Sequence, residues 1–100
     1  MRIDRIGGTG GEYFTDPGTP FAGRALPPDR LEAPRREWEV RADHPALADG
    51  SVRLERSQVA PWFGQPGGGV QYRFVDEAGK PLSNEDLWKR EMIEEVPRGR

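Results

Sequence analysis

The sequence contains no cysteine and a single histidine, His44. Without cysteine the chain has no disulfide framework and no thiolate metal site, and one isolated histidine disfavours a histidine-based metal centre or a Ser-His-Asp triad. No apolar run approaches membrane-spanning length, and no signal peptide is recognisable. The net charge of −2 disfavours nucleic acid, because domains that bind it are usually basic. We therefore expect no metal site, no membrane partner and no nucleic-acid partner.

Glycine and proline, in contrast, are abundant, with 13 and 10 residues. Because both residues interrupt regular elements, this composition predicts a loop-rich fold rather than a helical bundle. A chain of 100 residues is expected to form one domain, residues 1–100, around one modest core. Met1 stands directly on the motif-like stretch "RIDRIGG", which favours a domain excised from the C-terminal part of a longer protein.

Three segments alternate apolar and polar residues with the period of two that is typical of half-buried strands. They are 36–42 with Trp38, Val40 and Ala42 inward, 51–56 with Val52 and Leu54 inward, and 70–76 with Val70, Tyr72 and Phe74 inward. On the third segment, Gln71, Arg73 and Val75 therefore face the opposite side of the predicted sheet.

The end of the chain predicts a helix that starts after Ser83, which is a good N-cap residue. Leu82 and Leu87 are spaced as a hydrophobic staple across that cap. Trp88, Met92 and Val96 then lie on one stripe with Ile93 beside it, which predicts that the helix continues to "PRGR" at 97–100 and frays there.

Residues 5–28 carry too many glycines and prolines for a long helix or strand, yet they include aromatic residues that a disordered linker would lack. We expect an ordered, irregular segment with at most a short turn of helix and a tight turn at Asp16–Thr19. The expected fold class is α+β, with small, mainly antiparallel twisted β-sheets, glycine-rich loops and a C-terminal helix.

Several candidate functional features have ordinary structural explanations beside the functional ones. The clusters "GGTGGE" and "GQPGGG" lack the context of a nucleotide fingerprint, and the pattern alone favours flexible turns. Arg24 can present a fixed fork to a phosphate or satisfy loop carbonyls, and the pattern does not choose. His44 before Pro45 is interpreted as a turn residue. Trp62 and Phe63 are interpreted as core or rim aromatics on which a planar ligand could stack.

Two motifs together carry a resemblance that nearly spans the chain. "DRIGGTGGEYFTDPGTPFAGRALPP", followed by "VAPWFGQPGGGVQYRF", resembles the TNT domain, a family of C-terminal toxin domains with NAD+ glycohydrolase activity. The resemblance implies catalytic roles for Arg5 and Gln71. It also implies substrate-binding roles for Arg24, for Tyr13 or Phe14 as the ring against nicotinamide, and for Gly68 and Gly69. With these motifs in place, the flexible-loop interpretation of "GQPGGG" is set aside.

The same resemblance implies an ADP-ribosyltransferase-like sheet and NAD+ as the substrate, with no additional cofactor. It further implies a secreted effector that acts in the cytoplasm of a target cell and a cognate immunity protein that blocks it. Cleavage of NADP+ is left open. Two alternatives also stay open at this point: a mono-ADP-ribosyltransferase that modifies a macromolecule, and a non-catalytic domain that only binds a partner.

Overall fold

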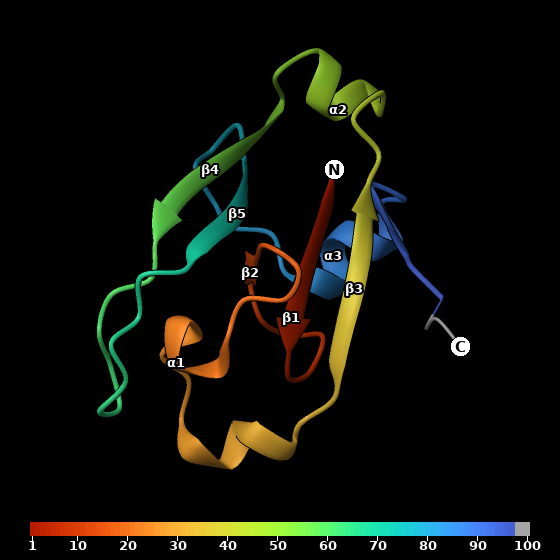
Figure 1. Ribbon diagram of the computed structural model, residues 1–100. Helices are drawn as coiled ribbons and strands as arrows, with labels where there is room; N and C mark the ends of the chain where they lie inside the picture. Colours follow the sequence, from red (N-terminus) through yellow and green to blue (C-terminus); the bar gives the residue numbers. More distant parts are fainter. Residues whose placement is uncertain (98–100) are drawn as a thin grey trace.

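Six strands form one antiparallel sheet in the order β4-β5-β2-β1-β3-β6 (Figure 1). The structure is a computed structural model that describes residues 1–97, apart from the side chain of Glu32. Its strands are β1 (Arg2–Ile6), β2 (Tyr13–Thr15), β3 (Arg35–Val40), β4 (Val52–Gln58), β5 (Val70–Asp76) and β6 (Ile93–Glu95). Its helices are α1 (Phe21–Arg24), the 3-10 helix η1 (Pro28–Glu32), α2 (Pro45–Ala48) and α3 (Asn84–Lys89). The predicted α+β class is confirmed.

Strands β3, β4 and β5 confirm the three alternating segments. On β3, Trp38 and Val40 are buried as predicted, but Ala42 lies beyond the end of the strand and is exposed. On β4, Leu54 was expected to face inward, yet 37% of its surface is exposed. Because β4 is an edge strand, a side chain on it has cross-strand neighbours on one side only.

Two strands, β1 and β2, were not predicted from the sequence. β2 falls within residues 5–28, and β1 occupies an inner position in the sheet. Neighbouring residues Ile3 and Asp4 of β1 are both fully buried, so the strand lacks the simple alternation that marks the others. The tight turn at Asp16–Thr19 and the short helical turn, now α1, are confirmed; the Thr19 N–H donates to the Asp16 carbonyl at 3.2 Å.

The C-terminal helix is shorter than predicted. It begins as expected, because Ser83 and Asp86 form a reciprocal capping box, and both staple residues, Leu82 and Leu87, are buried. It ends at Lys89 instead of continuing to Val96. Glu91 then takes the left-handed conformation with φ 60°, and the chain turns back to form β6. The predicted fraying at "PRGR" falls mostly on residues 98–100, outside the described residues.

This correction also changes the role of the apolar stripe. Met92 and Ile93 are buried, but they belong to the turn and strand that pair with β3 rather than to a helix face. Trp88, expected on the same stripe, has 56% of its surface exposed. In the view of Figure 1, α3 lies behind β1 and β3, and the final strand passes the edge of β3.

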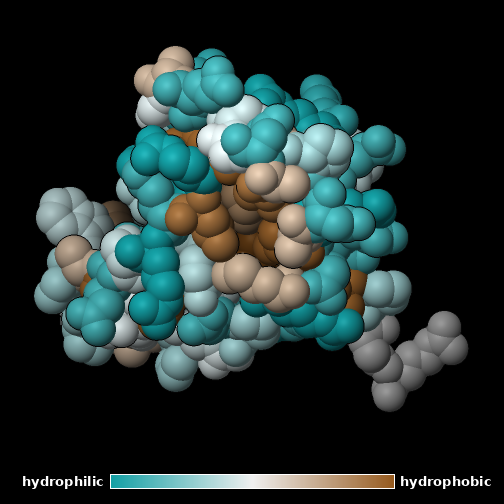
Figure 2. Space-filling model, turned by 90° about the horizontal axis from the view of Figure 1, so that it is seen from above, coloured by the Kyte–Doolittle hydropathy of each residue, from teal (hydrophilic) through white to brown (hydrophobic). Residues whose placement is uncertain are grey.

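The core is built from the strands and from the segment around α3. Phe14 of β2 and Phe74 of β5 meet edge to face, with ring centroids 6.1 Å apart. At the end of the molecule that carries α2, the surface shows an apolar hollow surrounded by polar side chains (Figure 2). Ala46 and Leu47 of α2 are only partly buried against the core. The candidate site lies at the opposite end.

The sheet consists of two halves joined at a narrow boundary. β4 and β5 share seven aligned residue pairs and β1 and β3 share five, whereas β1 and β2 share one, Asp4 with Thr15. The same two residues are also joined by their side chains, since the Thr15 hydroxyl donates to Asp4 Oδ1 at 2.6 Å. Side-chain hydrogen bonding therefore reinforces the sheet where its backbone ladder is shortest.

Candidate active site

Helices α1 and η1 lie at one end of the sheet (Figure 1). A cavity of about 530 Å³ opens at this end. Its walls come from the ends of β1 and β2, from segment 24–27 with Arg30, and from residues 59–62 after β4. Cavities of about 300–1,000 Å³ are typical of small-molecule sites. Of the predicted site residues, the cavity brings together Arg5, Tyr13, Arg24 and Gln71, and it does not include Phe14, Gly68 or Gly69.

Arg5 is a partly buried cation that is held by backbone carbonyls. Its Nε donates to Gly8 at 3.1 Å and its Nη1 to Tyr13 at 2.7 Å, and within residues 1–97 no ion pair to a carboxylate is formed. A Cβ added at Gly11 would collide with the Arg5 guanidinium, so the glycine makes room for this side chain. Burial lowers the pKa of the Arg5 guanidinium, and the charge of Arg30 lowers it further. Such a group is suited to receiving an anion.

Arg24 is engaged inside the protein. Its Nη1 and Nη2 donate to the two carboxylate oxygens of Asp4 at 2.7 and 2.9 Å, its Nη1 also donates to the Thr15 hydroxyl, and its Nε donates to the Thr19 carbonyl. Four of its five N–H donors are thus used, and only 3% of the side chain is exposed. The substrate-binding role of Arg24 stays a prediction, but these contacts give it a structural role.

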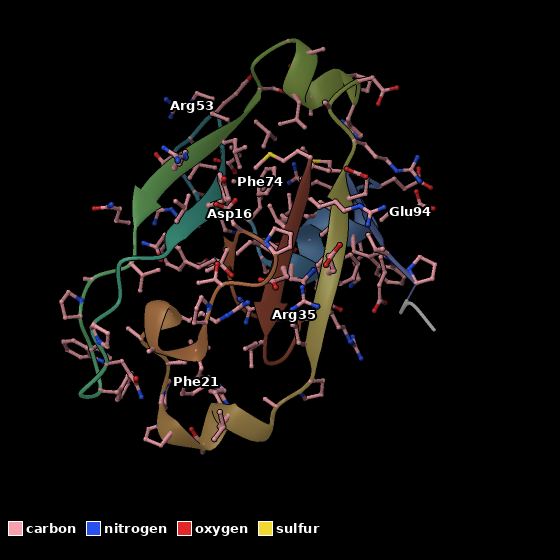
Figure 3. The ribbon with its side chains drawn as sticks, in the orientation of Figure 1. Asp16, Phe21, Arg35, Arg53, Phe74 and Glu94 are labelled. Carbon is pink, nitrogen blue, oxygen red and sulfur yellow. The ribbon has the colours of Figure 1, made fainter. Side chains whose placement is uncertain are left out.

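Asp4, which the sequence analysis did not single out, is the centre of this cluster. Its carboxylate also accepts the Nε of Arg35 at 2.6 Å and the Gly18 N–H at 3.3 Å, and Arg35 lies beside β1 (Figure 3). Burial alone would raise the pKa of Asp4, but the hydrogen bonds from Arg24 and Thr15 and the charge of Arg24 outweigh it and lower that pKa. The carboxylate is therefore held ionised.

Strand β2 separates the two candidate aromatic rings. Phe14 points into the core, with 1% of its surface exposed, and so it does not reach the cavity. Tyr13 faces the other way because successive side chains on a strand alternate, and 46% of its surface is exposed. The Arg73 guanidinium lies over its ring, 5.6 Å from the centroid. Tyr13 is the ring that a ligand in the cavity can meet.

Gln71 is fixed at the start of β5 between two strands. It is aligned with Thr15 of β2 and with Ser57 of β4, and its Nε2 donates to the Ser57 hydroxyl at 3.0 Å. Within the described residues its Oε1 has no hydrogen-bond donor. The neighbouring side chains Tyr72 and Phe74 are buried, although Val75, expected on the Gln71 face, is buried as well.

The glycine triplet contacts protein backbone. Gly67, Gly68 and Gly69 donate their N–H groups to the carbonyls of Ala22, Val59 and Gly23, respectively. A Cβ at Gly69 would lie 2.8 Å from the Gly23 carbonyl oxygen, and one at Gly67 would lie 2.5 Å from that of Val59. Gly69 therefore allows α1 to approach the chain between β4 and β5, and Gly67 allows the two sides of that connection to approach each other. The amides of the triplet are already used, which disfavours the predicted substrate-binding role of Gly68 and Gly69.

Two further parts of the wall concern residues that the sequence analysis left open or missed. Trp62, one of the two candidate rim aromatics, borders the cavity, and it meets Phe63 edge to face at the exposed tip of the connection. Arg30 of η1 also borders the cavity. It looked like an ordinary surface charge, and the signal available for it was its position two residues after "RALPP", whose prolines fix the start of η1.

Other candidate features lie elsewhere or are not found in residues 1–97. His44 is a turn residue as predicted, since its Nδ1 accepts the Ala46 N–H at 3.1 Å and caps α2. No cluster of three or more His, Cys, Asp or Glu in the described part of the chain could hold a metal ion. None of the described helices has the length and apolarity needed to cross a membrane.

Comparison with known proteins agrees with this architecture. A profile of the family described as "Tuberculosis necrotizing toxin" matches residues 1–96. The outer membrane channel proteins CpnT of Mycobacterium bovis (strain BCG / Pasteur 1173P2) and Mycobacterium tuberculosis (strain ATCC 25618 / H37Rv) are each 33% identical over 96 residues, covering 92% of this chain and 11% of theirs. Tuberculosis necrotizing toxin, solved in complex with its immunity factor IFT, aligns with a TM-score of 0.80 and 32% identity, over 93% of this chain and 46% of that chain.

Proposed function

Because the chain belongs to the tuberculosis necrotizing toxin family, we propose that it is a toxin domain that hydrolyses NAD+ to nicotinamide and ADP-ribose. The observation that carries this proposal is the wall of the cavity. Three side chains meet there: Arg5, which has no carboxylate partner among the described residues, the exposed ring of Tyr13, and the strand-held amide of Gln71. These are the group types that a diphosphate, a planar ring and a ribose require.

The chemistry needs few catalytic groups. Hydrolysis breaks the bond between C1 of the ribose and the pyridinium nitrogen, and nicotinamide leaves as a neutral molecule, so no general acid is required. The barrier lies in forming the oxocarbenium-like centre and in presenting a water molecule to it. A cavity that holds the dinucleotide in one orientation and excludes other water can lower that barrier.

Each of the three side chains has a defined task in this scheme. Arg5 binds phosphate oxygens, because its guanidinium is fixed by two carbonyls and carries a charge that no described carboxylate balances. Tyr13 offers its face to the nicotinamide ring. Gln71 keeps its Nε2 on Ser57, which aims its Oε1 to accept a hydrogen bond from a ribose hydroxyl or from the attacking water. An amide cannot act as a base, so Gln71 orients rather than deprotonates.

We also propose that a cognate immunity protein covers this cavity and that the domain acts in the cytoplasm of a target cell after secretion. The related toxin was solved with its immunity factor, which supports the first part. At the rim, Trp62 and Phe63 are 64% and 50% exposed, and exposed aromatic residues of this kind are enriched at protein interfaces. The chain spans only 11% of the CpnT proteins, so the route of delivery is inferred from the family alone.

Chromatography of the products after incubation with NAD+ tests the proposed activity, and Gln71→Ala is the matching variant. We expect turnover to fall by roughly two to three orders of magnitude, because one preorganised polar group is removed. The fold should persist, since only one hydrogen bond, worth about 1 kcal/mol, is lost. Gln58→Ala, on the exposed end of β4, is the control and should retain wild-type turnover.

Four outcomes would count against the proposal. Full turnover by Gln71→Ala would remove the amide from the mechanism, and so would a loss of activity that merely follows a loss of fold seen by circular dichroism. Label from NAD+ fixed on lysate protein without free ADP-ribose would indicate a mono-ADP-ribosyltransferase. No consumption of NAD+ by the purified wild-type domain would favour a non-catalytic binding role.

A further inference from the structure

We propose that Arg30 of η1 and Arg5 of β1 together bind the diphosphate of the dinucleotide, while Arg24 serves as scaffold. This inference rests on the proposed function, because it assigns a ligand group to one wall of the same cavity. It gives Arg30 the phosphate-binding role that the sequence considered for Arg24.

The positions of Arg5 and Arg30 allow them to act together. Arg5 and Arg30 come from different elements, yet both border the cavity. Both also approach one glycine: Nη2 of Arg5 and Nε of Arg30 lie 3.6 and 3.8 Å from the position that a Cβ of Gly7 would take. Two guanidinium groups that meet beside one backbone position can contact the two phosphates of a single diphosphate, and each provides a planar fork for paired oxygens.

The charges of Arg5 and Arg30 are not balanced by the described carboxylates. Within the described part of the chain, neither Arg5 nor Arg30 forms an ion pair. The two positive charges repel each other, and the charge of Arg30 therefore lowers the pKa of Arg5. Of the two described carboxylates on the cavity wall, Asp4 is bound by Arg24 and Arg35, and Glu12 forms no described ion pair with Arg5 or Arg30. A dianion bound between Arg5 and Arg30 would relieve this repulsion.

The backbone around Arg30 is held in place by hydrogen bonds. The Arg30 N–H donates to the Pro27 carbonyl at 2.9 Å, and its own carbonyl accepts the Ala33 N–H at 3.0 Å. The end of η1 is tied to the end of β1, because the Gly7 N–H donates to the Pro34 carbonyl at 3.1 Å. Arg30 therefore projects from a fixed turn, which lowers the entropy lost when its side chain binds a ligand.

Arg24, in contrast, has little capacity left for a ligand. Four of its N–H groups are used within the protein and its charge is balanced by Asp4. Pulling it toward a diphosphate would leave a buried carboxylate with fewer partners, which is costly. Its contacts instead fix β1, and thereby Arg5, relative to α1.

Binding of inorganic pyrophosphate, measured by isothermal titration calorimetry, tests the pair without requiring catalysis. The variants are Arg30→Ala and Arg30→Lys, with Arg53→Ala as the control, because Arg53 is an exposed arginine on β4, away from η1 (Figure 3). We expect Arg30→Ala to weaken pyrophosphate binding at least tenfold, Arg30→Lys to weaken it less, and Arg53→Ala to leave it unchanged. In NAD+ turnover, Arg30→Ala should raise KM by a similar factor and change kcat less.

The outcomes separate this inference from the proposed function. Pyrophosphate binding that depends on Arg30, in a domain that does not cleave NAD+, would support the phosphate site and reject the hydrolase. Cleavage of NAD+ with wild-type KM and wild-type pyrophosphate affinity in folded Arg30→Ala would reject the inference and keep the hydrolase. Failure of the wild-type domain to bind pyrophosphate at millimolar concentration, or an equal loss in Arg53→Ala, would also overturn the pair.

Discussion

The Asp4→Asn substitution is expected to lower the free energy of unfolding by about 3–5 kcal/mol, the range found when one partner of a buried ion pair is removed. Asp4 is fully buried and accepts five hydrogen bonds, from Thr15, Gly18, Arg35 and twice from Arg24. Asparagine keeps the shape, but it removes the charge and places an N–H₂ donor against other donors. The Arg24 guanidinium, with 3% of its side chain exposed, is then buried without a counter-charge.

A loss of 3 kcal/mol corresponds to a decrease of at least about 12 °C in the melting temperature of a domain of this size. Circular dichroism during heating and in urea measures both quantities. Glu39→Gln is the control: it removes ion pairs to Arg2 and the N-terminus at the surface, where such pairs contribute little. If Asp4→Asn melted within a few degrees of that control, the cluster around Asp4 would not be holding the fold together, and the reasoning would be refuted.

Three further predictions follow from the same geometry. Gly11→Ala should reduce NAD+ turnover, because the added Cβ occupies the place of the Arg5 guanidinium. The control Gly10→Ala should keep wild-type turnover, because its Cβ meets open space. Equal kinetics of the two variants would contradict this prediction. Gly69→Ala should destabilise the domain by about 1–3 kcal/mol in urea, because its Cβ would lie 2.8 Å from a carbonyl oxygen of α1; an unchanged midpoint would refute the close approach. Because the pKa of Asp4 is lowered in the folded state, its ionised carboxylate stabilises the fold at pH values above the ordinary carboxyl pKa of 3.8, and this stabilisation is lost as the pH falls through the lower folded-state pKa. The free energies of unfolding of wild type and Asp4→Asn should therefore differ near neutral pH and converge in acid. A difference that stays constant with pH would contradict this prediction.

The strands that could be predicted from the sequence are those whose two faces differ in polarity. The sequence of each of β3, β4 and β5 alternates; Trp38 and Val40 of β3 and Tyr72 and Phe74 of β5 are buried as the alternation predicts, whereas on β4 only Val52 is. β1 could not be predicted in this way, because it lies inside the sheet and carries Asp4 on a buried position, where alternation predicts an apolar residue. The extension of the final helix was wrong because Met92 and Ile93 fit a helical stripe equally well. The left-handed Glu91, which ends that option, has no signature in the sequence.

The candidate site was predictable where a residue depends on its own strand and not where it depends on a distant partner. Alternation along β5 is enough to place Gln71 outside the core, whereas the choice between Tyr13 and Phe14 stayed open because β2 was not predicted. The partner of Arg24 is Asp4, 20 residues away, and the pairing becomes visible only when β1 is placed beside β2. For Arg30 the same holds: its proximity to Arg5 arises from the return of the chain along η1 to the end of β1.

Because only the pair Asp4–Thr15 aligns between β1 and β2, we expect the two halves of the sheet to separate there before either half unfolds. Such a local opening would move Arg5 away from Gln71 while the seven aligned pairs of β4 and β5 stay intact. Amide hydrogens of β2 should then exchange with solvent through an opening of lower free energy than those in the middle of β5. The site would then be lost at a lower denaturant concentration than the one at which the sheet unfolds. The hydrogen bonds between Asp4 and Arg24 would set the difference between these two concentrations.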